Sequence, residues 1–178
     1  MIDDEFKMVL ERLEAINEEV HRMNQAFAAI KDGMSYEQAF SEYVCSEVAS
    51  EKKTISSKLA TLMQHLLKFK YCTNSYQDND WKRTINHSID KIKIILRWKS
   101  KKKDVTLIKY TISEMNDSYD EAVELYKDDA KWFPDLADGI KFIPEKCPWT
   151  LEDLMDNDPG KLMAALPDPD YTKMYLRR

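Results

Sequence analysis

Hydrophobic residues recur with a heptad spacing along the first thirty residues. Steps of four and three residues alternate without a break, which places the apolar side chains on one stripe of a helix. The stripe consists of Ile2, Phe6, Val9, Leu13, Ile16, Val20, Met23, Phe27 and Ile30. Gly33 is well placed to end this helix, because glycine readily adopts the left-handed conformation that follows a last turn. We therefore predict one long helix over residues 1–32 and call its apolar stripe the heptad seam.

Helical spacing also governs the rest of the chain as far as residue 132. Ser35 and Gln38 form the pattern of a capping box, and apolar residues then recur up to about residue 71, as two helices or one long one. Asp80 is placed to cap a helix over residues 81–99, and a further helix is predicted from about 105 to 132. Near the C-terminus, Thr150 and Asp153 form a second capping-box pattern, which predicts a short helix to about residue 156.

Glycine and proline are scarce. The 178 residues include three glycines and six prolines, which leaves few turns for a sheet protein but enough for long helices. The predicted fold class is all-α, a helical bundle with a long N-terminal heptad helix and a short C-terminal helix followed by an extended tail. The predicted organisation is a heptad helix over residues 1–32, packed on or projecting from the core, a bundle over 33–158 and a tail over 159–178.

The partner of the heptad seam is left open by the sequence. A parallel coiled-coil dimer usually carries opposite charges at the positions that flank its seam. The flanking pairs here, Glu5/Leu10, Arg12/Asn17, Glu19/Asn24 and Ala26/Lys31, form no such set. Packing within the chain and self-association as a homodimer both remain. The residues predicted to bind a partner are Val9, Leu13, Ile16, Val20, Met23 and Phe27.

Charge is strongly segregated along the chain. Residues 1–50 carry four basic and eleven acidic residues, residues 51–110 carry fifteen and five, and residues 111–170 carry five and sixteen. Within the basic part, Arg83, His87 and Lys91 are spaced four residues apart and share one side of the predicted helix. The full candidate surface for an anionic partner or a nucleic acid is Lys82, Arg83, His87, Lys91, Arg97, Lys101, Lys102 and Lys103.

Three interpretations of this basic segment compete. Its charges could pair with the acidic helix over residues 105–132, where Glu114 and Asp129 are among the carboxylates, and such exposed pairs contribute little energy. A basic stripe could instead bind backbone phosphates of RNA or DNA, with Trp81, Trp98, Tyr71 or Tyr76 stacking on bases. An acidic protein is the third possible partner.

Four short segments of the chain resemble a known family. Ser50-Glu51-Lys52-Lys53, His65-Leu66-Leu67-Lys68-Phe69 and Trp81 with Thr84-Ile85 occur in order, followed by Pro144-Glu145-Lys146-Cys147-Pro148-Trp149-Thr150-Leu151-Glu152-Asp153-Leu154. Together they resemble the bacterial domain-of-unknown-function family numbered twenty-nine, over about residues 33–156. The resemblance implies an all-helical bundle and brings no agreed activity, cofactor or catalytic residue. The heptad helix and the segment after Asp158 depart from the family's pattern.

Catalytic chemistry finds little support in the sequence. The three glycines stand far apart, which excludes a glycine-rich phosphate loop. A helical ribonuclease of the HEPN class is a remote alternative with Arg83 and His87, although their spacing is shorter than that class's motif. His65 and Cys147 are expected to be buried structural residues, since neither has an identifiable catalytic partner. We predict no catalytic residue, no metal and no cofactor.

The function expected from the sequence is therefore protein interaction. The chain would be a non-enzymatic cytoplasmic module that binds an unidentified protein as an inhibitor, antitoxin or accessory subunit, and a nucleic-acid-binding module on the basic helix 81–103 is the alternative. The acidic N-terminus does not resemble a targeting signal, and no apolar run is long enough for a bilayer, so no membrane association is expected. The three separated cysteines favour a reducing compartment.

Overall fold

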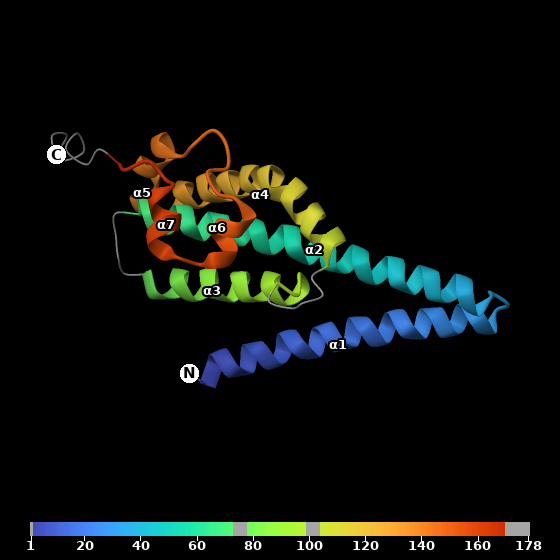
Figure 1. Cartoon of the computed structure of the whole chain (residues 1–178). Coiled ribbons are helices and arrows are strands. Elements are labelled where there is room, and N and C mark those ends of the chain that lie inside the picture. Colours follow the sequence, from blue (N-terminus) through green and yellow to red (C-terminus); the bar gives the residue numbers. More distant parts are fainter. Residues whose placement is uncertain (1, 73–77, 99–103, 170–178) are drawn as a thin grey trace. The chain divides into compact units, whose positions relative to one another are not determined.

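The computed structural model describes residues 2–72, 78–98 and 104–169. Every regular element in these ranges is a helix, which confirms the all-α prediction. The elements are α1 (Ile2–Lys31), α2 (Tyr36–Tyr71), α3 (Asp78–Ile95), α4 (Val105–Trp132), α5 (Pro134–Ala137), the 3₁₀-helix η2 (Asp138–Phe142), α6 (Leu151–Asp156) and α7 (Pro159–Ala164) (Figure 1). The chain divides into two compact units, residues 1–51 and residues 52–178, so the division falls inside α2 and not at the predicted boundary after residue 32.

The first unit is a helical hairpin of α1 and the beginning of α2. Gly33 takes a positive φ of 100°, and the Met34 amide donates to the Ala29 carbonyl at 2.9 Å, the hydrogen bond that closes a helix end with a left-handed residue. The Ser35 hydroxyl then accepts from the Gln38 amide at 3.2 Å, as the capping pattern predicts. This turn reverses the chain direction between the two helices (Figure 1).

The second unit is built around the C-terminal part of α2. Its side chains Ile55, Leu59, Leu62, Met63, Leu66 and Leu67 are all buried, on more than one side of the helix. A helix that is apolar over so much of its circumference needs neighbours on several sides. It has them in α3 and α4, and α6 in turn contacts both of these helices (Figure 1). The core of this unit is therefore the space around α2.

Three buried tyrosines hold the segment of short elements after α4 against the helices. The hydroxyl of Tyr71 donates to the carbonyl of Phe142 at 3.0 Å, that of Tyr119 to Pro144 at 2.9 Å and that of Tyr126 to Leu136 at 2.9 Å. Each bond satisfies a tyrosine hydroxyl and a backbone carbonyl at once. Residues 136–144 thus follow a path that is set by tertiary contacts.

The limits of the helices agree with the sequence in most places. Residues 36–71 form one continuous helix, α4 covers the predicted 105–132, and α6 begins after Thr150 as expected. The predicted helix over 81–99 begins earlier, at Asp78, and ends earlier, at Ile95. It ends there because Arg97 adopts a left-handed conformation with φ 50°, and the Trp98 amide donates back to the Lys93 carbonyl at 2.9 Å.

The segment after residue 158 differs from the extended tail that we predicted. It starts with α7, which packs on α6, and Leu162 and Leu166 are buried. Lys70 of α2 donates to the Met163 carbonyl at 3.2 Å and pairs with Asp168 at 2.5 Å. Residues 159–168 are therefore part of the second unit, and the start of α7 was signalled by Asp158 as a cap followed by Pro159.

No helix in the described part of the chain is long and apolar enough to cross a membrane.

Candidate interaction surfaces

From Leu13 to Phe27, the heptad seam is an apolar feature that the hairpin leaves largely exposed. The side chains of Leu13, Ile16, Val20, Met23 and Phe27 are between 42% and 62% exposed. Val9 lies in α1, but its side chain is outside the described residues. Large apolar side chains that form a continuous exposed stripe are unusual on a monomer and mark interaction sites.

A different side of α1 faces the interior of the hairpin. Arg22, Ala26 and Ala29 of α1 are half-buried, and Ala39 of α2 is only 1% exposed. Small side chains let two helices approach closely without interlocking large residues. Alanines therefore contribute to the contact between the two helices, while the seam residues from Leu13 to Phe27 remain available for another contact.

The first part of α2 extends this apolar surface. Tyr36, Phe40 and Val44 lie at steps of four residues and are exposed, and the rings of Tyr36 and Phe40 stack at 6.2 Å. We call these three residues together with Leu13, Ile16, Val20, Met23 and Phe27 the hairpin face. A hollow of about 210 Å³ lies in it at the turn end of the hairpin.

The hollow is lined almost entirely by apolar groups. Met23, Phe27 and Ile30 line it from α1. Tyr36, Phe40 and Tyr43 line it from α2. The residues that line it carry no charge, so an occupant would be an apolar side chain or a small set of them.

The second candidate surface is the basic side of α3. Lys82, Arg83, His87, Lys91 and Arg97 are all exposed, so the stripe inferred from their spacing exists on the surface. Lys101, Lys102 and Lys103 lie outside the described residues.

Local contacts reduce the positive charge of this stripe. Arg83 pairs with Asp80 at 3.4 Å, and Asp90 is also exposed on the helix. The ammonium group of Lys82 lies 5.1 Å from the centre of the Phe69 ring of α2. The stripe is therefore a mixed surface on which neighbouring groups already engage basic side chains or dilute their charge.

The aromatic residues proposed to stack on bases are placed differently from the expectation. Trp81 and Tyr71 are buried in the core of the second unit. Trp98 is half-buried, and Tyr76 lies outside the described residues. Trp81 and Tyr71 cannot offer an open ring face to a nucleic acid, so that part of the prediction is wrong.

Acidic residues of α4 contact α2, whereas one of the three interpretations paired them with the basic helix. The Asp129 carboxylate accepts from Gln64 at 2.6 Å and pairs with Lys68 at 2.6 Å. Glu114 accepts from the Ser56 hydroxyl at 3.0 Å, and that hydroxyl also lies 2.9 Å from the Tyr110 hydroxyl. These polar contacts set the register between α2 and α4.

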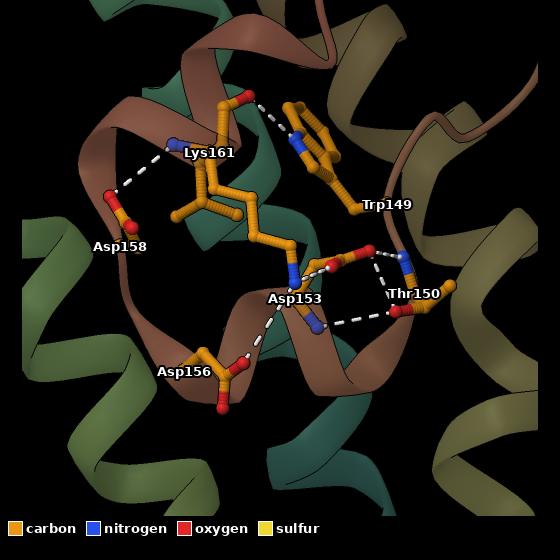
Figure 2. A network of polar contacts seen from close by, with 7 residues as sticks. Trp149, Thr150, Asp153, Asp156, Asp158 and Lys161 are labelled. Carbon is orange, nitrogen blue, oxygen red and sulfur yellow. Dashed lines mark hydrogen bonds and ion pairs between the residues drawn. The ribbon is translucent and has the colours of Figure 1, made fainter.

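A third polar cluster joins α6 and α7 (Figure 2). The Thr150 hydroxyl accepts from the Asp153 amide at 3.2 Å, and the Asp153 carboxylate accepts from the Thr150 amide at 3.0 Å, a complete capping box. Lys161 of α7 reaches back to Asp153 at 2.5 Å and lies 3.8 Å from Asp156. The Trp149 indole donates to the Leu162 carbonyl at 2.9 Å.

Electrostatics in this cluster are those of a structural clamp. The hydrogen bond from Lys161, with further ones from Thr150, holds the pKa of Asp153 well below its usual value. The same contact raises the pKa of Lys161. Both groups are held in their charged forms, so neither is suited to exchange a proton near neutral pH.

The surroundings of the remaining candidate residues, His65 and Cys147, indicate a structural role. His65 Nδ1 lies 2.9 Å from the Thr61 carbonyl, and burial lowers the pKa of this histidine. Burial raises the pKa of Cys147, whose thiol lies 3.5 Å from the Trp149 carbonyl, and this favours the unreactive thiol over the thiolate. Among the residues that the structure describes, no group of three or more His, Cys, Asp or Glu side chains is placed to hold a metal ion.

A second hollow, of about 360 Å³, lies beside α4. Tyr119, Asp120 and Glu124 line it from that helix, and Ile143 and Glu145 line it from the loop. Its charged rim is partly neutralised by Lys127, which pairs with Glu124 at 2.7 Å. The residues that line it combine charged and apolar groups and include no candidate nucleophile beside a base.

One protein family matches most of the chain. The model of the family described as Domain of unknown function DUF29 matches residues 36–158, well over half of the chain. No curated protein and no solved structure matches the chain. The matched range begins at the start of α2 and ends after α6, so α1 and α7 lie outside it. The chain therefore belongs to the family of the domain of unknown function DUF29.

Proposed function

We propose that this protein is a non-enzymatic, cytoplasmic protein-interaction module that binds another polypeptide through its hairpin face, as an inhibitor, antitoxin or accessory subunit. The observation that carries the proposal is the exposure of a heptad seam, from Leu13 to Phe27, on a helix of which another side contributes to closing the hairpin. A stripe of this regularity is costly to leave in water, because complete burial of a large apolar side chain gains on the order of 1.5–3 kcal/mol, and these side chains are still about half exposed.

The chemical surroundings support binding in preference to catalysis. The hollow in the hairpin face is apolar, and two ionisable groups with shifted pKa values, Asp153 and Lys161, belong to a clamp between two helices. Ionisable groups whose pKa values are shifted because they form ion pairs and hydrogen bonds with one another also occur in structural networks, so these shifts do not by themselves mark an active site.

Capture experiments at two salt concentrations test the proposal. The tagged full chain would be purified from its host beside two variants, Val20→Glu with Phe27→Glu on the hairpin face and Arg83→Glu with Lys91→Glu on α3. We expect the wild-type chain to capture a partner protein that stays bound at high salt. The hairpin variant should no longer capture this partner, and the α3 variant should still capture it. Apolar interfaces tolerate salt, whereas phosphate contacts weaken steeply as salt rises.

The exposed stripe on α3 keeps nucleic acid as the second candidate. Arg83, His87 and Lys91 share one exposed side of the helix. If RNA or DNA were captured at low salt, released at high salt and lost with the α3 variant, the nucleic-acid function would replace the one proposed. An exposed isoleucine elsewhere, changed in Ile112→Glu, controls for the mere addition of a carboxylate.

A further inference from the structure

The hairpin face is complementary to itself, and we infer that the chain which covers it in the isolated protein is a second copy in antiparallel orientation. This inference rests on the proposed function, because it names the occupant of the same face. The argument uses the spacing of the seam, the position of the hollow and the charges along α1.

The spacing of the seam suits another helix with the same repeat. Apolar residues repeat every 3.5 residues on average, and such a stripe stays in contact over several turns only when two helices coil around each other. Among the described residues of the first unit, Met23, Phe27 and Ile30 line a hollow together with residues of α2, yet the seam residues from Leu13 to Phe27 keep 42% to 62% of their surface exposed. Much of the seam therefore remains open to a further helix. A second copy brings a seam of identical period.

In one antiparallel register, each seam residue of one copy faces a seam residue of the other copy, and the same pairs form in both directions. When Val20 of one copy faces Met23 of the other, Ile16 faces Phe27 and Leu13 faces Ile30. Each of these pairs occurs twice, once on either side of a twofold axis, as a closed dimer requires.

The hollow is placed where this register needs it. It lies beside Met23, Phe27 and Ile30, near the turn of the hairpin, whereas the opposite half of the seam carries the projecting side chains of Leu13, Ile16 and Val20. In the antiparallel pair, the half with projecting side chains faces the half with the hollow. Both hollows are then filled in the same contact.

Charge selects this register over its neighbour. The chosen alignment places Glu19 opposite Ala26 and Asn17 opposite Asn24, so no like charges meet at these flanking positions. A slip by one heptad in one direction would place Glu19 of one copy opposite Glu19 of the other, and like charges in contact are unfavourable. A slip in the other direction brings no like charges together, but it leaves only the seam pairs Val20–Ile30 and Met23–Phe27. The other acids of this stretch, such as Glu14 and Glu18, lie at positions away from the seam.

The area that a stable pair needs sets a requirement for this contact. The eight side chains of the hairpin face are between 37% and 69% exposed. A standard interface takes about 800 Å² from each partner, so a stable dimer has to bury most of the exposed surface of these eight residues, those of α2 included.

The first test measures the mass of the full chain in solution. Sedimentation over a range of concentrations should show a monomer–dimer equilibrium, and Val20→Glu with Phe27→Glu should shift it to monomer while far-ultraviolet circular dichroism keeps its helical content. Both side chains are exposed in the single chain, so the substitutions should leave the helices intact. The matched control, Ile94→Glu with Ile112→Glu, changes two exposed isoleucines of the second unit and should keep the dimer.

The second test measures orientation and register. Asn17→Lys with Asn24→Glu creates two opposite-charge pairs in the antiparallel register and should tighten dimerisation, roughly three- to tenfold for two such pairs. In a parallel pair the same change would place the new carboxylate at position 24 beside Glu19 of the other copy and weaken the dimer. Asn17→Glu with Asn24→Glu should weaken the antiparallel dimer by a similar factor.

Three outcomes would overturn the inference. They are a chain that stays monomeric at every concentration, a dimer that ignores the hairpin variant, and a dimer that Asn17→Lys with Asn24→Glu weakens. The proposed function fails separately. If the chain is a monomer that still captures a different protein through Val20 and Phe27, the inferred dimer is wrong and the proposed function stands. If the chain is a monomer and captures no protein in this way, both the inferred dimer and the proposed function are wrong.

Discussion

The hydroxyl of Tyr126 occupies the space where a side chain at position 139 would begin. It donates to the Leu136 carbonyl at 2.9 Å, and Gly139 lies directly against it. On its other side, a Cβ at this position would lie 2.6 Å from the Cβ of Tyr71, closer than any ordinary contact. Gly139 therefore marks the point where η2 packs onto α2 and α4 through backbone alone.

Replacing this glycine should destabilise the second unit. Gly139→Ala is expected to lower the free energy of unfolding by about 1–3 kcal/mol, because overpacking forces buried groups to move. Neither tyrosine can easily yield, since both hydroxyls are engaged with backbone carbonyls. Urea unfolding measures the effect, and Gly160→Ala, whose nearest neighbour would be the Asp158 carboxylate at 3.3 Å, should cost less than about 1 kcal/mol. Equal stability of the two variants would contradict the prediction.

The left-handed conformation of Arg97 predicts a stabilising substitution. A residue with a side chain loses about 1 kcal/mol in this region compared with glycine, which adopts it without steric cost. Arg97→Gly should therefore raise the free energy of unfolding by about 0.5–1 kcal/mol. Lys91→Gly, within the exposed side of the same helix, should lower it by about 1 kcal/mol. If both variants lose stability in urea unfolding, the turn after α3 is not as described.

Burial of Tyr119 predicts a loss of stability in alkali. Burial raises the pKa of Tyr119 above its ordinary value of 10.0, so the folded chain keeps the phenol neutral where the unfolded chain ionises it. The contribution to stability is complete below about pH 10 and is lost as the pH rises from there toward the folded pKa. Tyr119→Phe should start from lower stability, having lost the hydrogen bond to Pro144, and should then fall less steeply above pH 10. Parallel profiles of unfolding free energy against pH for the two proteins would refute this assignment.

The clamp between α6 and α7 predicts a loss of stability in acid. Contacts with Lys161 and Thr150 lower the pKa of Asp153 from 3.8, so its contribution is present above about pH 4 and is lost as the pH falls through the lower, folded pKa. Asp153→Asn should remove this part of the acid dependence. Lys161→Met should remove some of it, because the Thr150 contacts remain. Unfolding measured by tryptophan fluorescence from pH 7 to pH 2 gives the comparison, and an unchanged acid slope in Asp153→Asn would count against the clamp.

Local signals were sufficient wherever a helix begins or ends by contacts within one turn. Thr150 and Asp153 show this, since both hydrogen bonds of the predicted capping box are present. Asp158 followed by Pro159 carried an equally local signal for α7, and attention to that pair would have found the helix. The first residue of α3 was harder to predict, because Asp78, Asn79 and Asp80 are all suitable residues for a helix start.

Contacts between residues far apart in the chain could not be predicted from such local patterns. Trp81 and Tyr71 lie among polar residues in the sequence and were considered for stacking on bases, yet both are buried. One of the three interpretations paired Glu114 and Asp129 with the basic helix, whereas they contact Ser56 and Lys68 of α2. Each outcome depends on which helix lies alongside, which no local pattern specifies.

Features of this protein that depend on contacts within a few residues could be predicted from the sequence, whereas features that depend on packing between helices could not. Helix formation, the turn at Gly33 and the existence of a heptad seam depend on hydrogen bonds and spacings within a few residues, so they can be obtained from the order of amino acids alone. Whether that seam is covered depends on which surfaces of α1 and α2 meet. Alanines on another side of α1 contribute to closing the hairpin, and Leu13 to Phe27 remain largely exposed, which is a result of the packing between two helices and not of the spacing within one.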